Sequence, residues 1–214
     1  MRSTPVRGII FDLDGTLIDS RKDLTTAINL MRAEYHLPPL ALEAVTGFVG
    51  DGARKLVERS LQGTTLDPAA ALARFKHHYD LHIADETCCY PGVEETLRVL
   101  QSRRVRCAII TNKPEAATRT VLRLLHLDQY FDSVVGGDTT PHLKPDPRSA
   151  LMVLERWGLT RVEALIVGDN HTDIAAAKRA GIRSVFVTYG IGAVGEEKPD
   201  FVFDKIEEIL ALAE

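Results

Sequence analysis

The chain has 214 residues, of which 45% are hydrophobic and 26% are charged, and its net charge at pH 7 is -4. This length and composition fit a globular protein with one main core and room for a smaller second lobe. The negative net charge and the scattered lysines and arginines argue against nucleic acid or anionic lipid as a partner.

Neither a signal peptide nor a membrane-spanning segment is expected near the N-terminus, because the short apolar run 8–11 ends at Asp12. The three cysteines include the adjacent pair Cys88 and Cys89, which does not fit a disulfide framework and favours a reducing compartment. We therefore expect a cytoplasmic protein that does not bind membranes.

The first structural signal is the branched apolar run 8–11, which is typical of a buried strand and opens into a polar loop at Asp12. The pattern then becomes helical, with Leu24, Ile28 and Met31 at helical spacing and further helices expected over 53–61 and 69–84. No strand is expected between residues 21 and 85. We interpret this stretch as an all-helical insertion after the first strand.

Strands and helices alternate from Pro91 onward. Such alternation predicts an α/β fold with a doubly wound, Rossmann-like parallel sheet, whose ligand crevice lies beyond the carboxyl ends of the strands. The expected strands are 105–111, 133–135, 164–167, 183–187 and 201–203, with helices beginning near residues 114, 147, 172 and 205.

The segment Asp12-Leu13-Asp14-Gly15-Thr16 places two carboxylates at the end of the first predicted strand. One carboxylate can attack phosphorus, while the other donates a proton to the leaving oxygen and later accepts one from water. The alternative is a simple turn in which Asp and Gly close a loop.

Three later segments carry polar residues that suit the same chemistry. Thr111 and Asn112 precede a predicted helix and can hold phosphate oxygens, although either could merely cap that helix. Lys144 can neutralise charge, or it can be a surface lysine. Asp169 can bind a hard cation and Asp173, four residues further on, can orient Lys144, unless both simply begin a solvated helix.

Together, the four segments resemble the motif set of the haloacid dehalogenase superfamily of phosphohydrolases, over nearly the whole chain. The resemblance implies Mg²⁺ as cofactor and an aspartyl-phosphate intermediate. It also implies the roles of nucleophile for Asp12, general acid and base for Asp14, phosphate binding for Thr111, Asn112 and Lys144, charge stabilisation for Lys144, metal binding for Asp12, Asp169 and the Asp14 carbonyl, and support for Asp173.

The resemblance further implies a catalytic core formed by residues 1–17 and 86–214 and a helical cap formed by residues 18–85. Within the cap, the segment 48–56 is similar to the cap loop of the phosphoglycolate phosphatase branch. A turn with Gly50 and Gly52 that leads to Arg54 could receive a small carboxylate, although Arg54 could equally face solvent.

The expected substrate is therefore a small-molecule phosphate monoester, with 2-phosphoglycolate as the first hypothesis, and the expected state is a monomer or homodimer. Alternatives are a sugar-phosphate or other metabolite phosphatase, a phosphomutase, and a binding module with vestigial acids. His171 and His142 depart from the residues that many relatives carry there, which leaves the exact ester open. His78 and His82 share a helix face but lack a third metal ligand.

Overall fold

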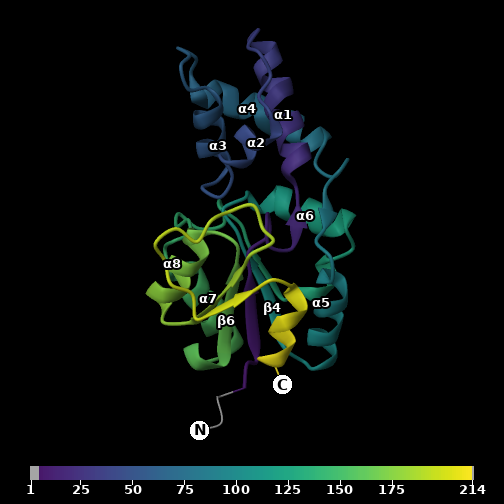
Figure 1. Cartoon of the computed structure of the whole chain (residues 1–214), viewed down its shortest axis with the longest axis vertical. Coiled ribbons are helices and arrows are strands. Elements are labelled where there is room, and N and C mark those ends of the chain that lie inside the picture. The colour runs from purple at the N-terminus through teal and green to yellow at the C-terminus, as the bar shows by residue number, and fades with distance from the viewer. Residues whose placement is uncertain (1–4, 214) are drawn as a thin grey trace.

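The computed structural model describes residues 5–213, which form a parallel sheet flanked by helices and a group of helices at one end (Figure 1). The central sheet has six parallel strands in the order β5-β4-β1-β6-β7-β8. The strands are β1 (Gly8–Phe11), β4 (Arg106–Ile110), β5 (Ser133–Val135), β6 (Ala164–Gly168), β7 (Arg183–Val187) and β8 (Phe201–Phe203). The predicted parallel α/β sheet is thus confirmed.

Strand β1 lies in the middle of the sheet, between β4 and β6. Its residues alternate between the two faces, as the pleat of a strand requires. Ile9 and Phe11 belong to the larger hydrophobic core, whereas Ile10 packs in a second core on the opposite face. Because both faces are covered, all four residues of β1 are buried, which explains their continuous apolar character.

The helices of the sheet region cover its two faces. Helices α5 (Val93–Ser102) and α6 (Glu115–Leu124) contribute to the larger core, while α7 (Arg148–Trp157) and α8 (His171–Ala180) contribute to the second. Three short 3-10 helices complete this region: η1 (Asp128–Tyr130), η2 (Arg161–Glu163) and η3 (Ile206–Ala211).

Four helices between β1 and α5 form a separate group at the end of the molecule where the strands end (Figure 1). Buried side chains along α1 and α4 join this group to the larger core, because both helices present an apolar stripe. The helices are α1 (Arg21–Glu34), α2 (Leu42–Thr46), α3 (Ala53–Ser60) and α4 (Pro68–Leu81). Within residues 5–213, no helix combines the length and apolar character needed to cross a bilayer.

A two-stranded antiparallel ladder joins the helical group to the rest of the chain. Strands β2 (Ile18–Asp19) and β3 (Cys88–Cys89) pair where the chain leaves for α1 and where it returns. Asp23 at the start of α1 is buried and accepts hydrogen bonds from the backbone N–H and the hydroxyl of Thr87, at 2.8 and 2.6 Å. These contacts hold the two connecting segments side by side.

Candidate active site

The carboxyl ends of β1, β4 and β6 bring together polar residues that are far apart in the sequence. Asp12 directly follows β1, Thr111 follows β4 and Asp169 follows β6. The register continues past β1, because the Asp12 N–H donates to the Val167 carbonyl at 2.9 Å. The site therefore lies at the edge of the sheet where an open parallel fold places its ligand.

Three acids meet at this edge. One carboxylate oxygen from each of Asp12, Asp169 and Asp173 lies within 4.8 Å of the other two. Lys144 Nζ lies 2.7 Å from Asp12 Oδ1 and 2.6 Å from Asp173 Oδ1, and all four side chains are nearly or fully buried. Three carboxylates are thus buried beside a single lysine, which contacts two of them, so the cluster has an excess of negative charge.

The pKa values of the acids reflect this excess. Burial raises the pKa of Asp12 to about 6, against the opposing effect of Lys144. Burial, followed by repulsion from Asp12, raises the pKa of Asp169 to about 6 as well. Without a further cation, the folded site therefore disfavours the charged form of both carboxylates.

A divalent cation fits this set of donors. Asp12 Oδ1 is buried, and the ammonium group of Lys144, 2.7 Å away, is the side-chain partner described for it within residues 5–213. Asp173 is otherwise engaged, because Oδ1 meets Lys144 and Oδ2 accepts from the Asn170 N–H at 3.0 Å. Asp12 and Asp169 are therefore the carboxylates best able to hold a hard cation such as Mg²⁺, which binds through few protein oxygens.

Asp169 is fixed from several directions. Its Oδ1 accepts from the Thr16 hydroxyl at 3.0 Å, and its Oδ2 accepts from the backbone N–H groups of Ile191 and Gly192 at 2.9 and 2.8 Å. Gly15 permits this approach, because a Cβ at residue 15 would lie 2.1 Å from Asp169 Oδ2. Oδ1 keeps a lone pair free for a cation.

Asp14 points to a different group of partners. Its carboxylate accepts from the Ser20 hydroxyl at 2.5 Å and from Lys113 Nζ at 3.0 and 3.1 Å. Lys113 Nζ also donates to the Tyr79 hydroxyl, 2.6 Å away on α4. We did not predict Lys113 or Tyr79 from the sequence. The position of Lys113 directly after Thr111 and Asn112 could have indicated it, whereas nothing in the helical pattern of α4 distinguishes Tyr79.

The structure gives Thr111 and Asn112 different surroundings. Thr111 is buried at the cavity wall, where its Oγ1 accepts from the Lys113 N–H at 3.2 Å and its own hydrogen can be donated. The Asn112 amide donates to the carbonyls of Gly50 and Lys144 and accepts from the Lys144 N–H, at 3.0, 3.2 and 2.8 Å. Its side-chain donors are therefore taken, which does not fit the expectation that this amide holds phosphate.

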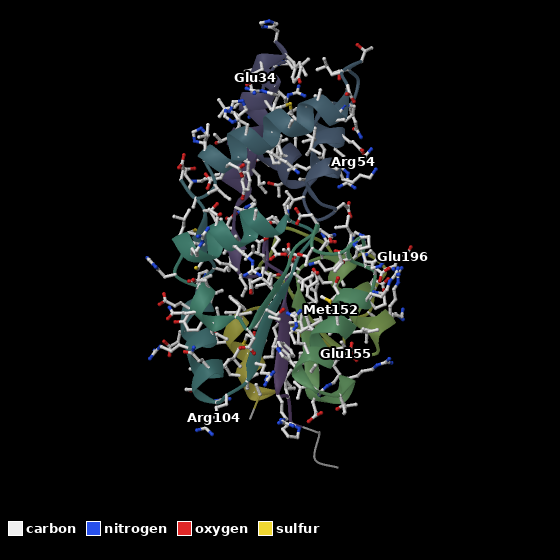
Figure 2. All side chains as sticks on the ribbon, turned by 180° about the vertical axis from the view of Figure 1, so that it is seen from behind. Glu34, Arg54, Arg104, Met152, Glu155 and Glu196 are labelled. Atoms are coloured by element: carbon white, nitrogen blue, oxygen red, sulfur yellow. The ribbon has the colours of Figure 1, made fainter. Side chains whose placement is uncertain are left out.

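A cavity of about 190 Å³ lies between the sheet edge and the helical group, and residues from both line it. Gly50 and Gly52 from the loop before α3 are among them. Arg54 is not: its side chain is 80% exposed, pairs with Glu58, and lies at the outer surface (Figure 2). The expectation that Arg54 receives a substrate carboxylate is not supported, because helix α3 turns it outward.

Comparisons with known proteins agree with this geometry. A family model for haloacid dehalogenase-like hydrolases matches residues 9–187. The chain is 42% identical to phosphoglycolate phosphatase 1 of Pseudomonas aeruginosa, over 97% of this chain and 80% of that protein. It is also 42% identical to a phosphoglycolate phosphatase of Pseudomonas putida, over 95% of this chain and 78% of that protein.

The chain belongs to the family of haloacid dehalogenase-like hydrolases. Its fold is similar to the crystal structure of a predicted phosphoglycolate phosphatase from Haemophilus somnus, with a TM-score of 0.94, 31% identity and 99% of each chain covered. The family match spans all four sequence segments that meet at the sheet edge, from Asp12 to Asp173. The resemblance found in the sequence is thus confirmed. Asp12, Asp14 and Thr111 line the cavity, and Lys144, Asp169 and Asp173 gather beside Asp12.

Proposed function

We propose that this enzyme, a phosphatase of the haloacid dehalogenase family, hydrolyses 2-phosphoglycolate through a phosphoryl intermediate on Asp12, with Mg²⁺ as cofactor. The observation that carries the proposal is the meeting of Asp12, Lys144 and Asp169 beside a cavity that Asp14 also lines. The names of the similar proteins support the choice of substrate.

In the proposed first step, a carboxylate oxygen of Asp12 attacks phosphorus and the bond from phosphorus to the leaving oxygen breaks. Asp14 gives its proton to the leaving oxygen, so that glycolate departs neutral at that atom. In the second step, Asp14 accepts a proton from water, the resulting hydroxide attacks phosphorus, and the bond to Asp12 breaks. The products are inorganic phosphate and free Asp12.

The surrounding residues offset the negative charge that gathers near phosphorus. Lys144 already contacts Asp12 and would face the phosphoryl oxygens, with Asp173 holding its ammonium group in place. Thr111 offers a hydroxyl donor at the end of β4. Asp12, Asp169 and the Asp14 carbonyl would hold Mg²⁺, which when bound supplies further positive charge for phosphoryl transfer.

We also propose that residues 18–85 act as a cap over a core formed by residues 1–17 and 86–214. The cavity lies between the two, and the β2–β3 ladder provides the connection about which a cap could move. Such closure would exclude water other than the attacking molecule from the reacting groups.

A sugar phosphate or another larger ester is the alternative that one observation favours. Much of the cavity wall is apolar, which suits a leaving group bigger than glycolate. The apolar residues are Leu24, Val49, Ala53, Leu56, Phe75, Ala116 and Ala117.

The test is phosphate release from a panel of monoesters, measured with Mg²⁺ and with a chelator. We expect Mg²⁺-dependent hydrolysis with the highest kcat/KM for 2-phosphoglycolate. A higher kcat/KM for sugar phosphates would assign a different substrate to the enzyme and leave the proposed phosphatase chemistry unchanged. If folded protein that binds Mg²⁺ releases no phosphate from any of these esters, the proposal is overturned.

A further inference from the structure

Lys113 is a buried cation on the leaving-group side of the cavity. Two lysines line the cavity within residues 5–213: Lys76 is exposed on α4, whereas Lys113 has only 5% of its side chain exposed. Lys144 is not among the residues that line the cavity and instead forms ion pairs with Asp12 and Asp173. Lys113 is thus the buried positive charge that the proposed phosphoryl chemistry does not use.

The position of Lys113 follows from its contact with Asp14. Because Asp14 is the proposed proton donor to the leaving oxygen, a group 3.0 Å from its carboxylate lies beside the leaving group rather than beside phosphorus. Lys144, in contrast, touches Asp12 on the phosphorus side. Lys113 therefore lies toward the leaving group and Lys144 toward phosphorus.

Lys113 can offer a hydrogen bond without releasing its partner. Its ammonium contacts both oxygens of Asp14, and Ser20 also holds that carboxylate. One of the two contacts can be exchanged for a ligand oxygen while the other persists. When Asp14 carries the proton that it gives to the leaving oxygen, its carboxyl group is neutral, and the buried ammonium group of Lys113 then matches an anionic ligand better than an uncharged one.

Tyr79 supplies a second donor from the helical group. Because an ammonium group can only donate, the Tyr79 oxygen accepts from Lys113 and keeps its own hydrogen for another acceptor. None of residues 5–213 is seen to accept it. Burial raises the pKa of Tyr79 to about 12, so this hydrogen is present at neutral pH.

We propose that Lys113 and Tyr79 bind a carboxylate on the leaving group, which makes them the specificity-determining pair of this phosphatase. This inference rests on the proposed function and assigns its recognition of the acid to residues other than Arg54. A carboxylate has two oxygens, which match one ammonium and one phenol donor. In 2-phosphoglycolate a single carbon separates the carboxylate from the leaving oxygen. Lys113 Nζ lies 3.0 Å from Asp14 Oδ1, so a ligand whose leaving oxygen meets Asp14 can place its carboxylate at Lys113.

The pair also joins the two parts of the molecule. Tyr79 lies on α4 of the helical group, whereas Lys113 lies between β4 and α6 of the sheet region. A carboxylate bound by both would therefore hold the helical group against the sheet region. A substrate that lacks the carboxylate would lose this contact along with its binding energy.

The experiment compares 2-phosphoglycolate with ethyl phosphate, which has a leaving group of similar size and no charge. The readout is the ratio of kcat/KM for the two esters, measured with Mg²⁺ for the wild type and for Lys113→Gln. We expect Lys113→Gln to lower this ratio at least ~30-fold, mostly through the KM for 2-phosphoglycolate. A fall in kcat/KM that is the same for both esters, as expected from losing the contact of Lys113 with Asp14, cancels in the ratio.

Two further variants complete the test. Tyr79→Phe keeps the ring and should lower the ratio about 3- to 10-fold, as expected for one lost hydrogen bond. It also provides the answer if Lys113→Gln fails to fold. Lys55→Gln, a control on α3 whose lysine is exposed and pairs with Glu58, should leave the ratio unchanged.

The outcomes separate this inference from the proposed function. If the wild type shows no preference for 2-phosphoglycolate over ethyl phosphate, the proposed substrate is wrong. If the wild type prefers 2-phosphoglycolate but Lys113→Gln and Tyr79→Phe keep the wild-type ratio, only the inference is overturned. A fall of the ratio in Arg54→Gln instead would return the role to Arg54.

Discussion

Lys144 Nζ lies 2.6 Å from Asp173 Oδ1, and both side chains are buried. Asp173 also accepts a hydrogen bond from the Asn170 N–H, so it fixes the lysine and the start of α8 together. Burial acts to lower the pKa of Lys144, but Asp12 and Asp173 outweigh it and raise the pKa above its ordinary value. The lysine is therefore charged, and its charge is needed by two acids.

Lys144→Gln should destabilise the fold as well as abolish activity. Removing the cation leaves Asp12 and Asp173 buried without their partner, which we expect to cost about 3–5 kcal/mol. Adding Asp173→Asn should recover about 1–3 kcal/mol of that loss, because one of the two acids is then neutral. Urea unfolding of the single and double variants gives these free energies. Recovery of activity in the double variant would contradict the proposed role of Lys144.

Asp12→Asn should abolish turnover and leave the fold intact. The change removes the attacking charge and keeps the volume of the side chain, so we expect kcat to fall by at least ~1000-fold. The assay is Mg²⁺-dependent phosphate release, with circular dichroism as the check on folding. Residual turnover near the wild-type rate would show that another group attacks phosphorus.

Asp14→Asn should affect different esters to different degrees. The variant cannot protonate the leaving oxygen, so the loss should be largest for alkyl esters and about 10- to 100-fold smaller for p-nitrophenyl phosphate, whose leaving group needs no proton. Single-turnover kinetics on both esters separates this step from hydrolysis of the intermediate. Equal losses on both esters would contradict the acid role and leave Asp14 a structural partner of Lys113 and Ser20.

Mg²⁺ should stabilise the protein more at pH 7 than at pH 5. The pKa values of Asp12 and Asp169 rise from 3.8 to about 6 on folding, so the folded state holds protons that the unfolded state has released. The contribution of these acids to stability therefore falls as the pH rises from about 4 to 6 without metal. A cation that needs both carboxylates deprotonated reverses this trend.

The measurement is the midpoint of thermal unfolding with chelator and with saturating Mg²⁺, at both pH values. Asp169→Asn is the matched control and should show a smaller shift with Mg²⁺ at pH 7, because one of the two carboxylates is absent. Equal shifts at pH 5 and pH 7 in the wild type would place the cation elsewhere.

The sheet and most of its polar edge could be predicted because each signal is local. The run 8–11 is buried on both faces and reads as apolar throughout, and Asp12, Thr111 and Asp169 follow their strands directly. The β2–β3 ladder was missed because each strand has two residues and its partner lies about 70 residues away. No periodic pattern can form over so short a strand.

The cavity wall could be predicted only in part, because it depends on how helices pack rather than on strand order. Arg54 and Tyr79 both lie on helices of the insertion, yet one is exposed and the other reaches Lys113. Which face of α3 or α4 meets the sheet region is decided by the three-dimensional packing of apolar stripes from several segments. The sequence therefore left open whether Arg54 faces the cavity or solvent, and in the structure Lys113 lines the cavity while Arg54 does not.

Gly15→Ala should damage the metal site selectively, because residue 15 has little space and an unusual backbone. Its φ is +91°, and an added Cβ would lie 2.1 Å from Asp169 Oδ2. Gly63→Ala is the matched control, since its φ is +81° but nothing lies within 4 Å of the added atom. Both changes should cost about 1–2 kcal/mol of stability for the left-handed backbone. Only Gly15→Ala should also weaken Mg²⁺ binding, seen as a higher Mg²⁺ concentration for half-maximal activity, and equal Mg²⁺ requirements in both variants would show that Asp169 does not hold the cation.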